Sequence, residues 1–470
     1  MNKLELYKTT TERFMTIPQV EEGRNGRIIN NQNPADRSEI LKSEADMRDH
    51  SKHVQVEKEQ AVEIIIENCR FAPETETVPA DESIGRVLAE DAVSQWDSPN
   101  TLTCMMDSVA VHWDDFKDGM PDTGSWVRGV QWEFANTGVG MPEGFDTAIV
   151  VEHVIFGEDD TKIAFDAMPS GRFAGTTAPG SRMQAGDLLA AKGTVITPLI
   201  AAHIMSGNNT EVRVVKKPVV AFLPTGNELV KAGGEIPSGK NIESNSIMIA
   251  GKIREWGGEP LVFDIVPDQK EALKNALREA AEKADIVVLN AGSSKGNDDW
   301  GIEMLEEIGT IFYHQTNHGP GHHSSFGVIG ETPVVGISGP PGGAAFTTDY
   351  YLYPAMMVYL GLDPHLPKVK ARLACEIAPV KKHVHAPEKA QAKGEERPRE
   401  GGKFYSIRQI VLKQAEDGVI EAWPLAGMRP GPVEAEAADA YYAMPTGDGD
   451  TAPACGDFIE VELRPDYKRF

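Results

Sequence analysis

The sequence has few cysteines, no long apolar run and no start typical of a secreted protein. Its four cysteines are scattered and form neither a C-x-x-C pair nor a metal-finger spacing, so we expect thiols in a reducing compartment. No stretch approaches the roughly 20 apolar residues of a membrane helix, and the opening MNKLELYKTTTERF is too charged for a signal peptide. We therefore expect a cytoplasmic protein with no membrane partner.

Positive charge is also scarce. The chain has 46 Lys and Arg against 71 Asp and Glu, a formal net charge of −25. A general nucleic-acid binder needs a basic face to displace counterions, so we expect no nucleic-acid partner. Any anionic ligand must then be held by locally arranged donors, because the overall field of the protein repels it.

At 470 residues the chain is too long for one ordinary core, and about two to four domains are expected. Residues 1–54 are polar and are interpreted as an extension with little core of its own. Residues 55–215 combine helical segments with a small β structure. An α/β domain is predicted at 216–365, and a β-rich C-terminal domain at 366–470.

Helical spacing predicts helices in VEKEQAVEIIIENC, SNSIMIAGKIREWGG, QKEALKNALREAAEKAD and DDWGIEMLEEIG. A last helix, in TTDYYLYPAMMVYLGL, carries Pro354, which predicts a kink or an early break. In the C-terminal region, KARLACEI, YSIRQIVLKQ, VIEAWPL and FIEVEL are predicted strands, interrupted by a solvated loop at 386–402.

Three glycine-bearing loops each follow an apolar run in the α/β region. They are residues 225–228, 290–296 and 338–343. Segments with helical spacing lie between them, so right-handed crossovers would place all three loops at the carboxyl edge of one parallel sheet. Glycine lets backbone N–H groups approach a phosphate or oxyanion, and a following helix N-terminus favours negative charge. The pattern predicts an anion-binding cleft at that edge.

Motifs over about residues 56–466 resemble the MoeA-type molybdopterin molybdenumtransferase family, which is related to the gephyrin E domain. MMDSVAV resembles the family's MDGYAV, and NTGVGMPEGFDTAIVVEHV resembles TGAPVPEGADAVV. PTGNELV, NAGSSKGNDD and GPGHHSSFG are similar to STGDEL, SGGVSVGDYD and KPGKPFAFG. A single glycine loop is weak evidence, but these motifs occur in the family's order along the chain.

The resemblance implies a multidomain α/β plus β protein. It would have N-terminal and linker domains with a small inserted β domain, a MogA-like three-layer α/β domain and a C-terminal β domain. It also implies a homodimeric enzyme that, with Mg²⁺, inserts molybdate, or the similar tungstate, into adenylated molybdopterin and releases AMP. The α/β domain would bind the pterin and phosphate, while the segments of Asp107 and Thr137 would approach from the other subunit.

Site residues follow from the resemblance, position by position. The implied catalytic acids are Asp107, Glu228, Asp268 and Asp299, of which Asp107 and Glu228 would bind the metal. The implied substrate- and anion-binding residues are Thr137, Thr225, Gly226, Gly292, Ser294, Lys295, His322 and Pro341.

Several of these residues also have an ordinary structural alternative. Glu228 could be an acid at a helix start, favoured by the helix dipole. Asp268 precedes a predicted helix and could be its N-cap, and of Asp298 and Asp299 one is expected to cap. Thr137 could serve only its turn, and each glycine loop could be a tight connection without a ligand.

Several positions depart from the family pattern. Gln315, Gly319 and His322 replace three family lysines, and Asn227 replaces an aspartate. Further replacements are Arg182 for an acid, Ser108-Val109 for Gly-Tyr, Pro340 for asparagine and Gly343 for serine. Loss of lysines at an oxyanion site removes fixed positive charge that would otherwise form charge-assisted hydrogen bonds.

Histidines could compensate for that loss. His314, His318, His322 and His323 fall in the segment HQTNHGPGHH, and histidines that are protonated near neutral pH would bind an anion until the pH rises past about 7. A turn whose histidines face water and a transition-metal site are the second and third interpretations.

Two classes of function therefore stay open. The first is molybdenum insertion into adenylated molybdopterin. The second is a non-catalytic paralogue that keeps the fold and dimer and binds a pterin, a nucleotide or a partner protein, which the replaced lysines and Asn227 favour. Less favoured is an enzyme for another oxyanion and another adenylated small molecule.

Overall fold

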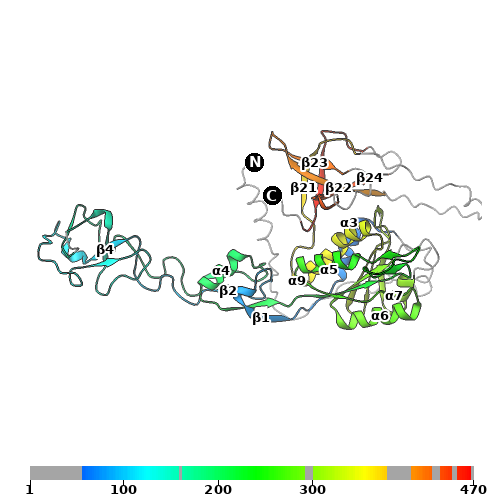
Figure 1. Ribbon diagram of the computed structural model, residues 1–470, viewed down its shortest axis with the longest axis horizontal. Helices are drawn as coiled ribbons and strands as arrows, with labels where there is room; N and C mark the ends of the chain where they lie inside the picture. Colours follow the sequence, from blue (N-terminus) through cyan, green and yellow to red (C-terminus); the bar gives the residue numbers. More distant parts are fainter. Residues whose placement is uncertain are drawn as a thin grey trace, which may run out of the picture. The chain divides into compact units, whose positions relative to one another are not determined.

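The computed structural model describes residues 55–157, 161–291, 300–377, 404–425, 435–446 and 452–466. It divides into two compact units, drawn in Figure 1. The smaller unit is Pro73–Lys216, and the larger combines the chain up to Ala72 with the chain from Lys217 onwards. The polar extension predicted at 1–54 and the solvated loop predicted at 386–402 lie outside the described residues.

The smaller unit consists mainly of short antiparallel strands. Four two-stranded pairs are β1 (Thr75–Pro79) with β11 (Glu211–Val215), β2 (Ala92–Val93) with β10 (Leu188–Ala190), β3 (Thr103–Cys104) with β9 (Thr176–Thr177), and β7 (Val154–Phe156) with β8 (Ile163–Phe165). A three-stranded sheet has β4 (Ser108–Val111) between β5 (Trp132–Ala135) and β6 (Thr147–Val150). Helix α4 (Pro198–Ser206) begins at an N-cap threonine, Thr197, whose hydroxyl accepts the Ile200 N–H. The small β structure predicted within residues 55–215 is thus present, as strands β3 to β9.

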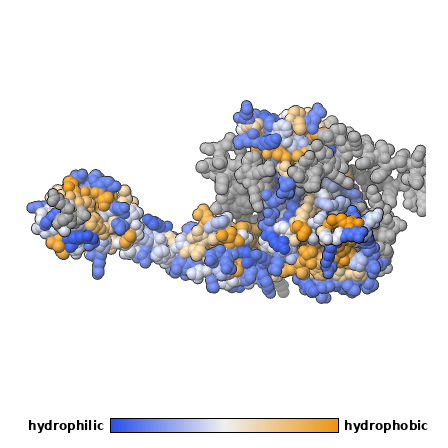
Figure 2. Space-filling view, in the orientation of Figure 1, coloured by the Kyte–Doolittle hydropathy of each residue, from blue (hydrophilic) through white to orange (hydrophobic). Residues whose placement is uncertain are grey.

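Two apolar clusters support this unit. One packs Leu88, Ile196 and Ile204 around α4, and the other packs aromatic residues, among them Phe116 and Trp132, inside the inserted β structure. Figure 2 shows that hydrophobic residues also reach the surface of the unit.

The larger unit contains the predicted α/β sheet. Its strand order is β15 (Glu259–Val262), β12 (Val219–Pro224), β16 (Ile286–Ala291), β20 (Thr332–Ser338), β19 (Ser325–Ile329) and β17 (Thr310–His314). β15, β12, β16 and β20 are parallel, whereas β19 is antiparallel to both of its neighbours. β12 and β16 are almost fully buried, as expected for central strands with helices on both faces.

Helices cover both faces of this sheet (Figure 1). α6 (Lys270–Lys283) and α7 (Trp300–Ile308) pack together on one face, while α5 (Asn245–Glu255) and α8 (Pro341–Thr347) pack together on the other. α3 (Lys58–Asn68) packs on α9 (Tyr353–Leu360). The predicted helices and the three-layer arrangement are confirmed.

The segment with Pro354 stays helical but changes type. A π-helical turn, Thr348–Leu352, joins α8 to α9, and Pro354 lies in the first turn of α9. Proline lacks an N–H and its ring crowds the carbonyl four residues before it, so a wider turn ahead of the proline relieves both problems. The predicted break therefore takes the form of a π-helical turn.

The C-terminal strands close into a barrel. They are β21 (Lys368–Leu373), β22 (Tyr405–Gln414), β23 (Ile420–Pro424), β24 (Ala440–Pro445) and β25 (Phe458–Leu463), in the order β22-β23-β21-β25-β24, with β24 pairing back to β22. The sequence pattern predicts this β region but not β24. A short strand of the α/β domain, β18 (His318–Gly319), runs parallel to the start of β22.

Within the part of the chain that the structure describes, no helix has both the length and the apolar character needed to cross a bilayer.

Candidate functional site

The glycine loops leave the sheet at one edge, as predicted. β12, β16 and β20 are adjacent and parallel, so loops 225–228 and 338–343 both start at their carboxyl ends. The second loop begins between them, but its residues Gly292, Ser294, Lys295 and Asp299 lie outside the described residues, as does Asp298. Loop 315–324, which carries His318, His322 and His323, leaves the same edge because β17 runs parallel to β20, each being antiparallel to β19.

Buried amides tie the ends of these strands together. The Thr225 hydroxyl donates to the Asn290 carbonyl at 3.0 Å, and the Asn290 amide donates to the Ser338 carbonyl at 2.9 Å. The Asn245 amide donates to Asn290 Oδ1 at 2.9 Å and to the Gly339 carbonyl at 2.8 Å. Thr225 thus helps to fix the edge instead of offering its hydroxyl to a ligand.

Asn245 is a residue of this edge that was not predicted from the sequence. The only sequence signal was an asparagine at the start of a predicted helix, a position that suggests an N-cap. In the structure Asn245 is buried in the first turn of α5 and bridges two loops, because tertiary packing brings Asn290 and Gly339 within reach of its amide.

In the first loop, the carboxylate of Glu228 lies against the Cα of Gly226. Gly226 has a φ of 144°, and a Cβ at this position would lie 2.5 Å from Glu228 Oε2. Only glycine therefore lets the Glu228 side chain occupy this place. No helix begins at Glu228: β13 (Leu229–Val230) follows, pairs with β14 (Asn241–Ile242), and α5 starts only at Asn245. The helix-start alternative for Glu228 is wrong, and so is the expectation that a helix N-terminus directly follows this loop.

Asp268 holds the same loop. Its carboxylate accepts the Asn227 N–H at 2.9 Å, and its own N–H donates to Asn227 Oδ1 at 3.2 Å. The N-cap of α6 is Gln269, without a side-chain cap, so the capping alternative for Asp268 is wrong. This reciprocal pair places the carboxylates of Glu228 and Asp268 on two segments that are bonded to each other.

The third loop is packed tightly at its base. A Cβ on Gly343 would lie 2.5 Å from Ser338 Oγ, so a side chain at position 343 would displace Ser338. Pro341 is exposed in the first turn of α8, and Pro340 is its N-cap. Proline is well suited to that first turn, where its missing N–H has no intrahelical acceptor.

The histidines do not form one anion-binding group. His318 is fully buried, where its Nε2 contacts the Tyr351 hydroxyl at 2.6 Å and its Nδ1 contacts the Pro320 carbonyl at 3.0 Å. A carbonyl can only accept, so Nδ1 carries the proton and Nε2 is the acceptor for the neighbouring hydroxyls of Tyr351 and Thr316, the latter at 2.9 Å. Desolvation lowers the pKa of His318 to about 3, so this histidine is neutral and belongs to the scaffold.

His322 remains at the surface beside His323, with their ring centroids 3.7 Å apart. Lost hydration of its ring, followed by the charge of His323, lowers the pKa of His322 to about 4. The prediction that these histidines charge near neutral pH is therefore wrong for both His318 and His322. The metal interpretation also lacks support, because no group of three or more His, Cys, Asp or Glu in the described ranges is placed to hold a metal ion.

A pH titration tests this correction. We expect the ratio of molybdate dissociation constants between His322→Asn and the native protein to stay constant between about pH 6 and 8. The reason is that His322, with its lowered pKa, becomes charged only as the pH falls toward about 4. A ratio that grows as the pH drops from 8 to 6 would show that His322 holds the anion with a protonated ring.

Asp107 and Thr137 meet in the smaller unit. Asp107 Oδ1 accepts the Thr137 N–H at 2.9 Å and the Thr137 hydroxyl at 3.0 Å. The backbone bond, followed by the hydroxyl, lowers the pKa of Asp107, so this carboxylate stays ionised at any physiological pH. The two residues thus form a preformed corner in which Thr137 contacts a single oxygen of the carboxylate, Oδ1.

Comparisons with known proteins agree with this architecture. The model of the MoeA N-terminal region (domain I and II) matches residues 56–206, and that of a probable molybdopterin binding domain matches residues 221–357. The molybdopterin molybdenumtransferase of Haemophilus influenzae is 27% identical over 301 residues, which cover 62% of this chain and 74% of that protein. The protein of the same name from Bacillus subtilis is 25% identical over 313 residues, covering 62% and 73%.

Among solved structures, the molybdopterin biosynthesis MoeA protein of Pyrococcus horikosii has a TM-score of 0.68 at 23% identity, covering 87% of this chain and 99% of that one. This likeness concerns the fold and agrees with the multidomain α/β plus β class. The chain belongs to the MoeA family, as a divergent member.

Proposed function

We propose that this protein is a molybdopterin molybdenumtransferase, an enzyme of molybdenum cofactor biosynthesis that inserts molybdate or tungstate into adenylated molybdopterin and releases AMP. The observation that carries the proposal is the carboxyl edge of the α/β sheet. There Asp268 bonds to the glycine loop that carries Glu228. The end of β12 is bonded to Asn290, and Asn245 links Asn290 to the loop before α8. The relatives with this name support the assignment.

The chain's residues would perform distinct tasks in this reaction. Backbone N–H groups of the glycines in the loop at 338–343 would hold phosphate and molybdate oxygens. In the first loop, the N–H groups of Thr225, Gly226 and Asn227 already donate to Asn290, Val266 and Asp268, so this loop would contribute its carboxylate. Glu228 and Asp268 offer the hard oxygen donors that Mg²⁺ prefers, and bound Mg²⁺ would neutralise charge on the phosphates. One or two carboxylates together with substrate phosphates suffice for such a site, so the described residues fit the ion.

Lys240 is a source of positive charge that the sequence analysis missed. Its ammonium donates to the carbonyl of Asn227, next to Glu228, while the strand that follows it bonds back to the Glu228 carbonyl. An ammonium has three donors, so Lys240 can bind an anion without releasing Asn227. It would partly replace the family lysines missing at positions 315, 319 and 322.

Lys240→Gln is therefore expected to weaken molybdate binding roughly three- to tenfold. The matched control is Lys231→Gln, which also removes an exposed charge from the connection between β13 and β14, but from a lysine paired with Asp264 at 2.6 Å. Equilibrium titration at several salt concentrations measures both variants. An equal loss of molybdate affinity in the two variants would show that Lys240 acts only through the overall charge of the surface.

We also propose that the enzyme is a homodimer in which Asp107 and Thr137 of one subunit complete the site of the other. The resemblance to the family suggests this arrangement. The surface around the corner supports it, because Met105, Met106, Val139 and Phe173 are all more than half exposed there. Exposed apolar side chains gathered around a polar pair suit a surface that another surface covers.

AMP release tests the function directly. The purified protein, incubated with adenylated molybdopterin, Mg²⁺ and molybdate, is expected to release AMP and to rescue a molybdenumtransferase-deficient bacterium. Ligand binding without AMP release would instead favour the second candidate, a non-catalytic paralogue. The low pKa values of His318 and His322 favour that candidate, because neither histidine replaces the charge of a missing lysine.

A further inference from the structure

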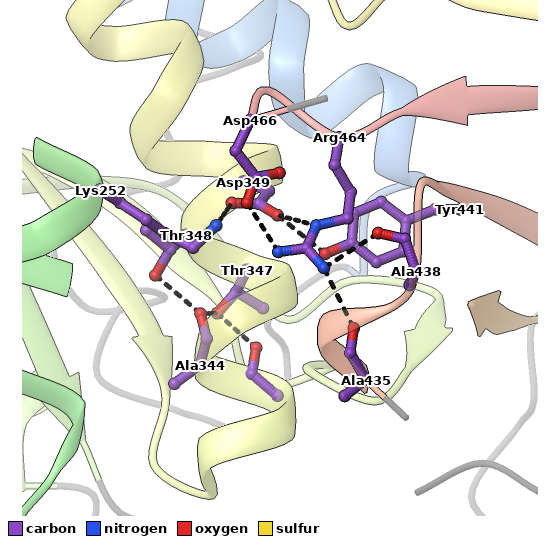
Figure 3. Close-up of polar contacts among 11 residues, drawn as sticks. Lys252, Ala344, Thr347, Thr348, Asp349, Ala435, Ala438, Tyr441, Arg464 and Asp466 are labelled. Carbon is purple, nitrogen blue, oxygen red and sulfur yellow. Dashed lines mark hydrogen bonds and ion pairs between the residues drawn. The ribbon is translucent and has the colours of Figure 1, made fainter. Parts of the chain in front are cut away.

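A buried ion pair joins the α/β domain to the C-terminal barrel. Asp349, in the π-helical turn, is fully buried and accepts Lys252 Nζ of α5 at 2.6 Å. From the barrel side, the Tyr441 hydroxyl of β24 donates to Asp349 at 2.8 Å, and Arg464 Nε lies 4.0 Å away. Figure 3 shows Lys252 and Tyr441 reaching Asp349 from opposite sides.

The neighbouring residue of the turn makes a second such joint. The hydroxyl of Tyr350 donates to Glu462 of β25, and Glu462 pairs with Lys58 of α3 at 2.6 Å. The wider π-helical turn holds more residues than an α-helical turn, so the angle between successive side chains is smaller. Two consecutive residues, Asp349 and Tyr350, can therefore both face the barrel.

Thr347, the last residue of α8 and the one just before this turn, is bonded to the loops at the anion-binding edge. Thr347 Oγ1 accepts the Ser338 N–H at 3.3 Å and donates to the Gly343 carbonyl at 2.9 Å. A Cβ on Gly321 would overlap the Thr347 methyl group, so the histidine loop also rests on Thr347. The backbone of that loop is held by the barrel as well, since the Tyr405 N–H donates to the Asn317 carbonyl at 2.8 Å.

We propose that Asp349 is a positioning residue for the anion-binding edge, through which the C-terminal barrel holds loops 315–324 and 338–343 at a fixed separation before a ligand binds. The family models that match this chain end before the barrel, and these contacts give the barrel a role in the site. The proposal deepens the proposed function and rests on it for the identity of the anion.

Stability alone is a poor explanation of the joint. Burial raises the pKa of Asp349, and Lys252 and Arg464 act in the opposite direction without overcoming it. Desolvation of such a pair offsets much of its Coulomb attraction, and a neutral pair of similar volume is often equally stable. The charged pair instead fixes one geometry. Lys252 of α5 donates to one oxygen of Asp349, and Tyr441 of β24 donates to the other.

The test separates position from stability. Asp349→Asn alone leaves the Lys252 charge without its partner and is expected to lower the melting temperature. The double variant Asp349→Asn/Lys252→Gln removes both charges and is expected to melt near the native protein. In the double variant, hydrogen exchange of peptides from 315–324 and 338–343 is expected to rise about tenfold while β12, β16 and β20 keep their protection. Molybdate binding is expected to weaken by a similar factor.

Asp417→Asn is the matched control, since it breaks an exposed ion pair of the barrel, with Arg372 at 2.7 Å, and is expected to leave loop exchange unchanged. Tyr441→Phe, which removes only one donor to Asp349, serves if the double variant does not fold, and it is expected to accelerate loop exchange to a smaller degree. Native loop exchange in a folded variant, or exchange that rises equally across the central strands, would overturn the proposal. If the native protein bound no molybdate, the proposed function would be wrong. Hydrogen exchange of the two loops would still show whether Asp349 positions them.

Discussion

Glu228→Gln is expected to reduce turnover by about 10²- to 10³-fold while the melting temperature changes little. The Glu228 carboxylate lies over Gly226 at the edge that carries the anion loops. It is partly exposed, so glutamine, which has the same shape, fits without a packing defect. What glutamine lacks is the negative charge that a hard cation and its bound phosphates require.

The control for this prediction is Glu235→Gln, which removes an exposed acid from the connection between β13 and β14. AMP release and thermal melting are measured for both variants. If Glu228→Gln melted far below the native protein, or if both variants lost the same activity, Glu228 would belong to the scaffold or to the general surface charge.

Mixing two inactive variants is expected to restore activity. Asp107→Ala and Glu228→Ala should each lose most turnover, because each removes a carboxylate from every site. If Asp107 acts on the partner subunit's site, a mixed dimer contains one site with both defects and one intact site. Random reassortment of a two-fold dimer would then restore about a quarter of the native activity.

Reassortment has to be allowed by dissociation and reassociation before the assay, and unmixed variants carried through the same steps are the control. A mixture that stays inactive although mixed dimers have formed would place Asp107 and Glu228 in the site of one and the same chain. A protein that stays monomeric at assay concentration would contradict the homodimer itself. Melting curves of both single variants identify any loss that is due to misfolding.

Local patterns in the sequence predicted most of the elements and the edge where the site lies. Apolar runs followed by glycine loops predicted that β12, β16 and β20 end at one edge, since right-handed crossovers leave a parallel sheet few alternatives. Helical spacing likewise predicted α5, α6 and α7. The strand β24 was missed because AYYAMP is short and follows an alanine- and glutamate-rich stretch.

The site was harder to predict because its residues act through distant partners. Asp268 looks like a helix cap from its neighbours in sequence, but Asn227, 41 residues away, takes its carboxylate. His318 sits in a polar motif that suggests exposure, yet Tyr351 and the barrel bury it. Lys240 gave no signal, because its nearest acceptor is the carbonyl of Asn227 across a pair of short strands.

The sequence by itself determined the family, the order of the elements and the place of the glycine loops, because these depend on local spacing and on the few topologies that a parallel sheet allows. Only the tertiary structure decided which polar residues stay at the surface of that edge and which hold the scaffold. Burial and partners set the charge of His318 and the geometry of Asp349, and both come from segments that are far apart in the chain.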